Sequence, residues 1–466
     1  MIENKGIILS NTSKLIHACL HTLPKSIGQA ELDAASKCLV DSLATALSAY
    51  GEEPINVLRS LNIENSVNGS STVIGYGEKA RPADVALING SMISLQLFDD
   101  NQAEMRGHPS GPLLPAVLAL AELKDLSIED ALKAFVIGYE MECRLGTIIN
   151  PSHYEIGFHA TCTQGTLAAV VASSIILKLT DDQMANALGI VSSLMGGVRR
   201  NFGTMTMSMH SGIAASNGIR AAQLAQKGFT GDPEIFDGAM SLGDVFSREW
   251  SPDLLDKNLD LWGKPFMIVS PGATFKLYPC GRPPLFAVDC ALAIQEKHHI
   301  PAENIEKIYC DVSFLYPRTL IHTNPKNGLQ AKASLQYCIA TSLLDGPPTL
   351  ASFSDENVNR DSIKNLIGRI EVRVPPHLSE DIPAVRKAPF EQPVTLEVHT
   401  KDGKIYSETV PIHKGSPLNP ASDADLKKKF IGCAKLHMNE KRADQVLVHI
   451  ANQKNSVREL MQLIKV

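Results

Sequence analysis

The stretch VTLEVHTKDGKIYSETV (residues 394–410) predicts a β-hairpin in a chain whose other segments are mostly helical in pattern. Apolar side chains alternate with polar ones from Val394 to Val398, which is the period of a strand with one buried face. Asp402-Gly403 is a strong two-residue turn signal between the two strands. Similar alternation at 308–312 and 370–374 predicts further strands, so this part of the chain is an α+β unit.

On both sides of this unit the chain is predicted to be helical. Apolar residues recur at spacings of three and four within residues 32–43, which is an amphipathic helix pattern. Ser127 and Thr180 each precede an apolar periodic segment, and each is followed three positions later by an acidic or amide residue, as helix N-caps are. The pattern changes around Pro271 and becomes helical again after Ser422. We therefore expect a helical body, an α+β unit and a helical tail.

The composition indicates a soluble globular protein. The chain has 466 residues, of which 44% are hydrophobic and 20% charged, and its formal net charge is −6. This mild negative charge gives no reason to expect a nucleic-acid partner. The N-terminus lacks the layout of a secretory signal, and the longest apolar run, residues 167–179, is too short to span a bilayer. We expect that run to be a buried helix, and the protein to be cytoplasmic with no membrane partner.

The nine cysteines show no Cys-x-x-Cys pair and no zinc-ligand spacing with histidine. Reduced thiols fit this distribution best. Cys38, Cys143, Cys290 and Cys338 lie in helical-looking apolar patterns, which favours core packing. The sequence therefore predicts no metal site.

The stretch LFDDNQAEMRGHPS (residues 97–110) is an unusually polar break between two apolar helices. Pro109 and the following Gly111-Pro112 place His108 in a loop that meets a helix N-terminus. The free amides of such a terminus suit a carboxylate substrate. The alternative is a surface loop whose aspartates cap helices.

A second polar stretch, HYEIGFHATCTQG (residues 153–165), precedes a helix of small residues that must be buried. Its histidine, tyrosine and glutamate are residue types that transfer protons in enzymes. A lone histidine here would more often be a satisfied core residue. The presence of both His153 and His159 beside hydroxyl groups favours function, whereas His210 is ambiguous between core and site.

A third stretch, GKPFMIVSPGATFKLYPCGR (residues 263–282), lies at the boundary between the helical body and the α+β unit, where substrate clefts commonly form. Lys276 and Arg282 are able to bind carboxylates. Cys280 has no sequence-evident base and is not expected to be a nucleophile. The alternative is a solvated linker between the two parts.

Short motifs along essentially the whole chain, taken in their order, resemble those of the MmgE/PrpD family. They are TVIGYG (72–77), ALING (86–90), FDD (98–100), HPS (108–110), GFHAT (157–161), NFGTMT (201–206), KLYPC (276–280) and SLQY (334–337).

The resemblance implies a mainly α fold with an α+β part. A large all-helical domain at 1–268 would be completed by C-terminal helices at 415–466, and a smaller α+β lid domain would occupy 269–414. The resemblance also implies a homodimer without metal or organic cofactor. Known members dehydrate 2-methylcitrate, decarboxylate cis-aconitate or epimerise iminodisuccinate, and each reaction moves a proton at a carbon next to a carboxylate.

Site residues follow from the resemblance position by position. The predicted catalytic residues, which fall on active-site histidines and a lysine of the family, are His159, His108 and Lys276. The predicted substrate-binding residues are Asn101, Asp100, Arg106, Arg200, Tyr316, Met207 and Leu97.

The chain departs from the family pattern at acid–base positions. Leu97 stands where the first aspartate of Asp-Phe-Asp-Asp-Thr is usual, and Asn101 replaces the threonine. Met207 stands where a second lysine is usual. The joint loss of a carboxylate and a lysine suggests that a matched ion pair has been removed. This hypothesis requires Leu97 and Met207 to pack together or to face the same cavity.

Three functions are compatible with these residues. The first is a cofactor-independent lyase, either a dehydratase or a decarboxylase, that acts on a small di- or tricarboxylate by histidine-based proton transfer. The second is an isomerase or epimerase of a related acid, since proton removal and return needs no leaving-group acid. The third is a catalytically degenerate member that binds a ligand.

Overall fold

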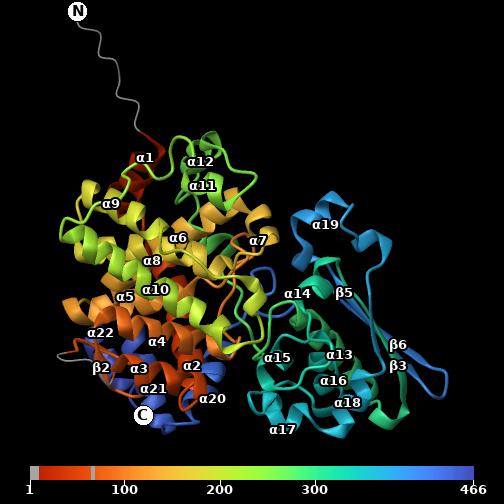
Figure 1. Ribbon diagram of the computed structural model, residues 1–466. Coiled ribbons are helices and arrows are strands. Elements are labelled where there is room, and N and C mark those ends of the chain that lie inside the picture. The colour runs from red at the N-terminus through yellow and green to blue at the C-terminus, as the bar shows by residue number, and fades with distance from the viewer. Residues whose placement is uncertain (1–9, 64–68) are drawn as a thin grey trace, which may run out of the picture.

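The computed structural model describes residues 10–63 and 69–466 (Figure 1). A helical body is formed by α1 (Asn11–His17), α2 (Gln29–Ser48), α3 (Glu53–Ile63), β1 (Ser71–Thr72), β2 (Lys79–Ala80), α4 (Pro82–Leu95), α5 (Ser110–Lys124), α6 (Ile128–Ile149), α7 (Ser152–Ile156), α8 (Ala160–Leu177), α9 (Asp181–Ser192), α10 (Met205–Gln226), α11 (Leu242–Phe246), α12 (Pro252–Leu259), α20 (Asp423–Ala434), α21 (Glu440–Ala451) and α22 (Val457–Leu463).

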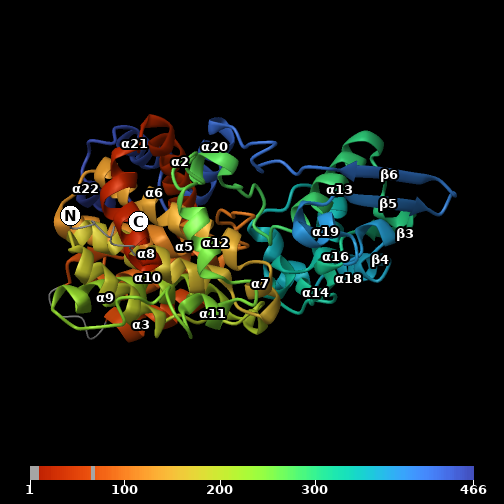
Figure 2. The same ribbon diagram turned by 90° about the horizontal axis from the view of Figure 1, so that it is seen from above.

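The α+β unit follows α12 in the chain and precedes α20. It contains α13 (Pro284–His298), β3 (Ile305–Asp311), α14 (Leu315–Thr319), α15 (Gly328–Lys332), α16 (Leu335–Asp345), α17 (Asp355–Val358), α18 (Asp361–Ile367), β4 (Ile370–Arg373), α19 (Pro383–Lys387), β5 (Val394–Thr400) and β6 (Ile405–Val410). Figure 2 shows the helical body on one side and the sheet of the α+β unit on the other. The predicted fold class, mainly α with an α+β part, is confirmed.

Helix α8 lies at the centre of the helical body, where it packs against α5, α6 and α10. It is long and apolar enough to cross a membrane by composition, but 94% of it is buried inside the protein, so the prediction of a buried helix is confirmed. Glycines let neighbouring helices approach closely: a Cβ on Gly212 of α10 would lie 2.0 Å from the carbonyl oxygen of Leu87 in α4. The two helices could not pack this way with any larger residue at position 212.

The two predicted helix caps are also confirmed. The Ser127 side chain accepts a hydrogen bond from the Asp130 amide at the start of α6, and Thr180 accepts one from the Gln183 amide at the start of α9. At the other end of the chain, Ser422 caps α20, which packs against α2. The C-terminal segment therefore lies against the N-terminal helices.

The α+β unit has a four-stranded sheet in the order β4-β3-β5-β6. The predicted hairpin is the β5–β6 pair, whose antiparallel register runs from Val394↔Val410 to His399↔Ile405. Burial alternates along β5, and the buried face packs against α13, which in turn contacts α16. This unit has an apolar core of its own, separate from that of the helical body.

Candidate active site

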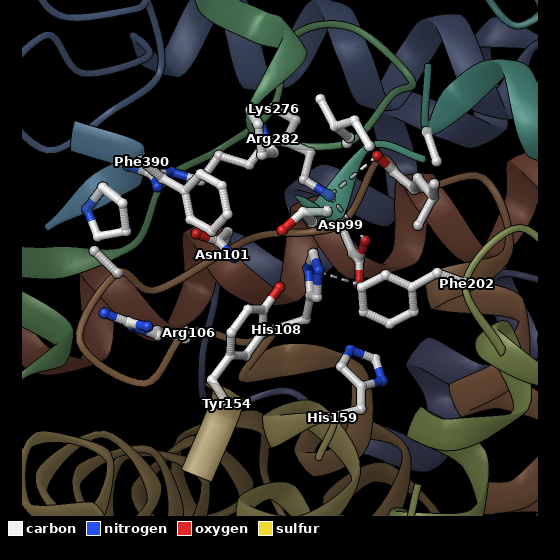
Figure 3. A pocket seen from close by; sticks show the side chains of 18 of the residues that line it. Asp99, Asn101, Arg106, His108, Tyr154, His159, Phe202, Lys276, Arg282 and Phe390 are labelled. Carbon is white, nitrogen blue, oxygen red and sulfur yellow. Dashed lines mark hydrogen bonds and ion pairs between the residues drawn. The ribbon is translucent and has the colours of Figure 1, made fainter. Parts of the chain in front are cut away.

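A cavity of about 260 Å³ lies where the helical body meets the α+β unit. The helical body lines it from the loop between α4 and α5, from α7, and from the turn that leads into α10. The α+β unit lines it from the loop before α13 and from residues 387–391. Figure 3 shows that titratable side chains from both parts converge on this space.

Asp99 lies at the centre of the polar side chains. Its carboxylate is 3.4 Å from Lys276 Nζ and 3.4 Å from His108 Nδ1, and it accepts a hydrogen bond of 3.1 Å from Ser94 Oγ. Burial would raise the pKa of Asp99, but the neighbouring His108 and Lys276 oppose burial and leave this pKa below its usual value. The carboxylate is therefore ionised and holds the lysine and the histidine together.

Lys276 is fully buried and reaches the site from the loop that precedes α13. Its ammonium donates to the carbonyl oxygen of Leu97 at 3.0 Å in addition to its contact with Asp99. Burial lowers the pKa of Lys276, and Asp99 opposes that shift. Paired backbone hydrogen bonds between Asn101 and Thr274, at 2.9 and 2.8 Å, align this loop with residues 97–110.

His108 is held in one tautomer by its surroundings. Its Nδ1 lies 2.7 Å from the carbonyl oxygen of Asp100, which can only accept, so Nδ1 carries the proton and Nε2 is the acceptor. Burial lowers the pKa of His108, although Asp99 opposes the shift. A neutral histidine with Nε2 free of a proton is suited to act as a base.

His159 precedes α8 as its N-cap residue and is 6% exposed. Its Nδ1 lies 2.9 Å from Nδ1 of His210, so one ring donates and the other accepts. Burial, followed by the neighbouring charges of His210 and His108, lowers the pKa of His159 well below its usual value. The rings of His159 and His108 are 6.4 Å apart, which places two neutral proton-transfer groups at one cavity.

Cationic side chains complete the lining. Arg106 donates to the carbonyl oxygen of Lys387 at 3.3 Å, while its other terminal nitrogen is buried without a hydrogen-bond partner. Arg282 is paired with Glu391, and its Nε is likewise buried without a partner. Buried guanidinium nitrogens without partners are costly, and a substrate carboxylate would satisfy them.

The segment from Leu97 to Arg106, in the loop between α4 and α5, is strained at both ends. Leu97 has a φ of 52° and Arg106 a φ of 55°, which are left-handed values that residues with a side chain rarely adopt. Asn101 Nδ2 donates to the Gly107 carbonyl oxygen at 2.9 Å and closes the loop between them. Strain of this kind is typical of functional sites.

Seven of the ten predicted site residues line the cavity, and their roles remain predictions. They are His159, His108, Lys276, Asn101, Arg106, Met207 and Leu97. Because Leu97 and Met207 face the same cavity, the geometric condition for a removed ion pair is met.

Three predicted substrate-binding residues do not line the cavity. Asp100 instead accepts hydrogen bonds from the Ser110 amide at 3.2 Å and hydroxyl at 2.6 Å, so it fills the α5 N-terminus that the sequence suggested for a substrate carboxylate. Burial raises the pKa of Asp100 to about 7. Arg200 is exposed, and Tyr316 is fully buried behind Phe390, with ring centroids 5.6 Å apart.

The two remaining histidines have different outcomes: His153 was expected to be functional but is buried away from the cavity, and His210 was left open between core and site. His153 is a core residue, held by the Phe246 carbonyl oxygen at 2.8 Å and Thr163 Oγ1 at 2.7 Å. His210 supports His159 from behind. All nine cysteines are free and buried, as the predicted core packing requires.

Sequence reasoning missed several residues of the lining. Asp99 belongs to the Asp-Asp pair in residues 97–110, but the sequence does not show which aspartate faces inward. Tyr154 was noted among the proton-transfer residue types of residues 153–165 but was not assigned to the site, and Phe202 lies in the NFGTMT motif without having been singled out. Phe390 and Glu391 have no motif at all, and only the fold brings them to the cavity.

The fold and this cavity define an enzyme whose active site is lined by buried titratable and cationic side chains. Within residues 10–63 and 69–466, no three His, Cys, Asp or Glu side chains are grouped so as to hold a metal ion.

Comparison with known proteins agrees with that class. Residues 15–255 match the MmgE/PrpD N-terminal domain and residues 278–453 match the MmgE/PrpD C-terminal domain. The chain therefore belongs to the MmgE/PrpD family, as its motifs indicated, and it is a lyase.

Individual relatives are named either cis-aconitate decarboxylase or 2-methylcitrate dehydratase. The chain is 29% identical over 409 residues to a cis-aconitate decarboxylase of Mus musculus, covering 84% of this chain and 80% of the relative. It is 26% identical over 412 residues to a 2-methylcitrate dehydratase of Cupriavidus necator, covering 81% of this chain and 80% of the relative. It is also 26% identical over 336 residues to a cis-aconitate decarboxylase of Aspergillus terreus, covering 67% of each chain.

Proposed function

We propose that this protein is a cofactor-independent dehydratase or decarboxylase of a small di- or tricarboxylate, and that histidines transfer the proton. The observation that carries the proposal is the meeting of His108 and His159, both kept neutral by burial, with the Lys276–Asp99 pair at one cavity. The names of the relatives support carboxylate chemistry of this kind.

Each group has a role in this proposal. Arg106 and Arg282 bind substrate carboxylates through their unpartnered nitrogens. His159, helped by His108, takes and returns the proton at the reacting carbon. When the proton leaves, negative charge develops on the adjacent carboxylate, and the Lys276 ammonium stabilises it.

Both reactions balance with a histidine and water. In dehydration, the base removes a proton, the C–H electron pair forms the C=C bond, and the hydroxyl leaves as water when the same histidine returns that proton to it. In decarboxylation, the C–C bond to the carboxylate breaks, carbon dioxide leaves, and the electron pair left on carbon takes a proton that the histidine has relayed from water.

The test is incubation in D₂O with the tricarboxylates citrate, 2-methylcitrate and cis-aconitate and with the dicarboxylate 2-propylmalate, followed by NMR of products and deuterium uptake. We expect elimination or decarboxylation of one of these acids, and we expect His159→Gln to abolish it. The exposed His377 provides a matched control, because His377→Gln changes the same residue type away from the cavity. Full activity of His159→Gln would refute the assignment of the base.

An epimerase is the second candidate, and one observation favours it. Two histidines lie at one cavity with their rings 6.4 Å apart, so one can remove a proton while the other, after taking a proton from water, returns one. Iminodisuccinate added to the same experiment would then show exchange or inversion without elimination. Binding without exchange or product would instead indicate the degenerate ligand-binding protein.

We also propose that the protein is a homodimer and that it is located in the cytoplasm. Light scattering during size-exclusion chromatography tests the dimer, because a mass near the 50.4 kDa of one chain would contradict it.

A further inference from the structure

An aromatic side chain lies beside His159 at one side of the cavity. Figure 3 shows Arg106 on one side of His108, and Phe202 with His159 on the other. The Phe202 ring lies 5.0 Å from the His159 ring and meets it edge to face. The carbon that reacts beside His159 therefore has an aromatic wall next to it.

Met207 extends this wall. It lies on α10 three residues before His210, so both side chains are on one face of the helix, and His210 contacts His159. Leu97 lines the same cavity and carries the carbonyl that holds the Lys276 ammonium. We refer to Phe202, Met207 and Leu97 as the apolar wall.

The charged side chains that line the cavity limit the number of carboxylates that its substrate can carry. The lining includes four cationic side chains against three carboxylates, which leaves one positive charge while the histidines are neutral. Lys276 and Arg282 are already paired with Asp99 and Glu391. In the part of the chain that the structure describes, the lining cations without a carboxylate partner are Arg106 and Lys387.

We propose that the substrate is a four-carbon dicarboxylate with an alkyl substituent on its reacting end, and that the substituent sits on the apolar wall. This substrate class rests on the proposed function. One of its carboxylates matches Arg106, and the other matches Arg282, whose Nε has no partner, whereas Lys387 is exposed to solvent. A third carboxylate would have to lose its water against Phe202 and Met207, which is strongly unfavourable without a cation in contact with it. Arg199 lies 5.9 Å from the Phe202 ring, but it does not line the cavity and donates to the Tyr154 carbonyl oxygen instead.

The test is binding, because it does not depend on turnover. 2-Propylsuccinate and propane-1,2,3-tricarboxylate share a succinate and differ only in a propyl or a carboxymethyl group at one carbon. Each buried methylene strengthens binding by about fourfold, so titration calorimetry should show the propyl compound binding more than about tenfold more tightly.

Lysine variants of two methionines on α10 test whether the apolar wall causes this binding preference. Met207→Lys places an ammonium on the apolar wall and should reverse the preference, by weakening 2-propylsuccinate and strengthening the tricarboxylate. Met205 lies on the same helix, is 45% exposed and does not line the cavity, so Met205→Lys should leave both affinities unchanged.

The outcomes separate this inference from the proposed function. Equal or tighter binding of the tricarboxylate, or no binding of either compound at millimolar concentration, would overturn the alkyl-dicarboxylate assignment even if citrate is dehydrated. Preferred binding of 2-propylsuccinate, with no elimination or deuterium exchange on 2-propylmalate or citrate, would support the assignment and overturn the proposed lyase reaction.

Discussion

Lys429 on the C-terminal helix α20 connects three segments beneath the cavity, and replacing it should destabilise the protein. Its ammonium lies 2.6 Å from the Asp41 carboxylate on α2 and donates to the carbonyl oxygens of Phe98 at 2.6 Å and Lys276 at 3.0 Å. Both side chains of the ion pair are almost fully buried, with exposures of 3% and 0%. Lys429→Met therefore leaves a buried carboxylate and two buried carbonyls without a donor.

Removing one partner of a buried ion pair costs about 3–5 kcal/mol. We expect a loss of this size in the free energy of unfolding, measured from urea denaturation followed by circular dichroism. Burial raises the pKa of Asp41 and Lys429 opposes that shift, so the variant raises this pKa further. A carboxyl whose folded pKa is raised destabilises the fold when ionised, so the loss should shrink as the pH falls from about 8 to about 5.

The neighbouring Lys428 is the matched control. It is an exposed lysine on the same helix, so Lys428→Met should change the free energy of unfolding by less than about 0.5 kcal/mol. Adding Asp41→Asn to Lys429→Met should recover much of the lost stability, because the unpaired charge is gone. A loss below about 1 kcal/mol for Lys429→Met, or a loss that does not depend on pH, would refute this reasoning.

Three further results are expected. Asp99→Asn removes the carboxylate between the site lysine and histidine and should lower kcat by about a hundredfold in steady-state assays, and an unchanged kcat would contradict its central role. Gly212→Ala should lower the urea midpoint because its Cβ would overlap Leu87, whereas Gly432→Ala, with open space around its Cβ, should not lower it. Because the pKa of His159 is far below its usual value, kcat/KM should stay level from about pH 8 to about pH 6, and a decline near pH 6.5 would show a titrating base.

Local features were the ones that the sequence predicted well. The β5–β6 hairpin, the caps at Ser127 and Thr180, and the buried helix α8 all follow from spacing and from turn or cap residues within a few positions. These features depend on neighbours along the chain, so one sequence is sufficient to predict them.

Side-chain direction at the site was predicted less well. Asp99 and Asp100 are adjacent, yet Asp99 faces the cavity while Asp100 caps α5. Arg200 was expected to bind substrate and is exposed. The sequence identified the polar loops correctly, but a rotation of one residue decides which side chain enters the cavity, and packing sets that rotation.

The sequence by itself determined the family, the mainly α class and the acid–base residue types, because ordered motifs and periodic patterns are properties of the chain. Only the tertiary structure decided how these residues are combined. Lys276 meets Asp99 across 177 positions, which joins the loop before α13 to the helical body, and Lys429 meets Asp41 across 388, which joins α20 to α2 within that body. Contacts over such distances form only when the chain folds. Tertiary packing also buries the histidines and keeps them neutral, and it places Phe202 and Arg106 on opposite sides of His108.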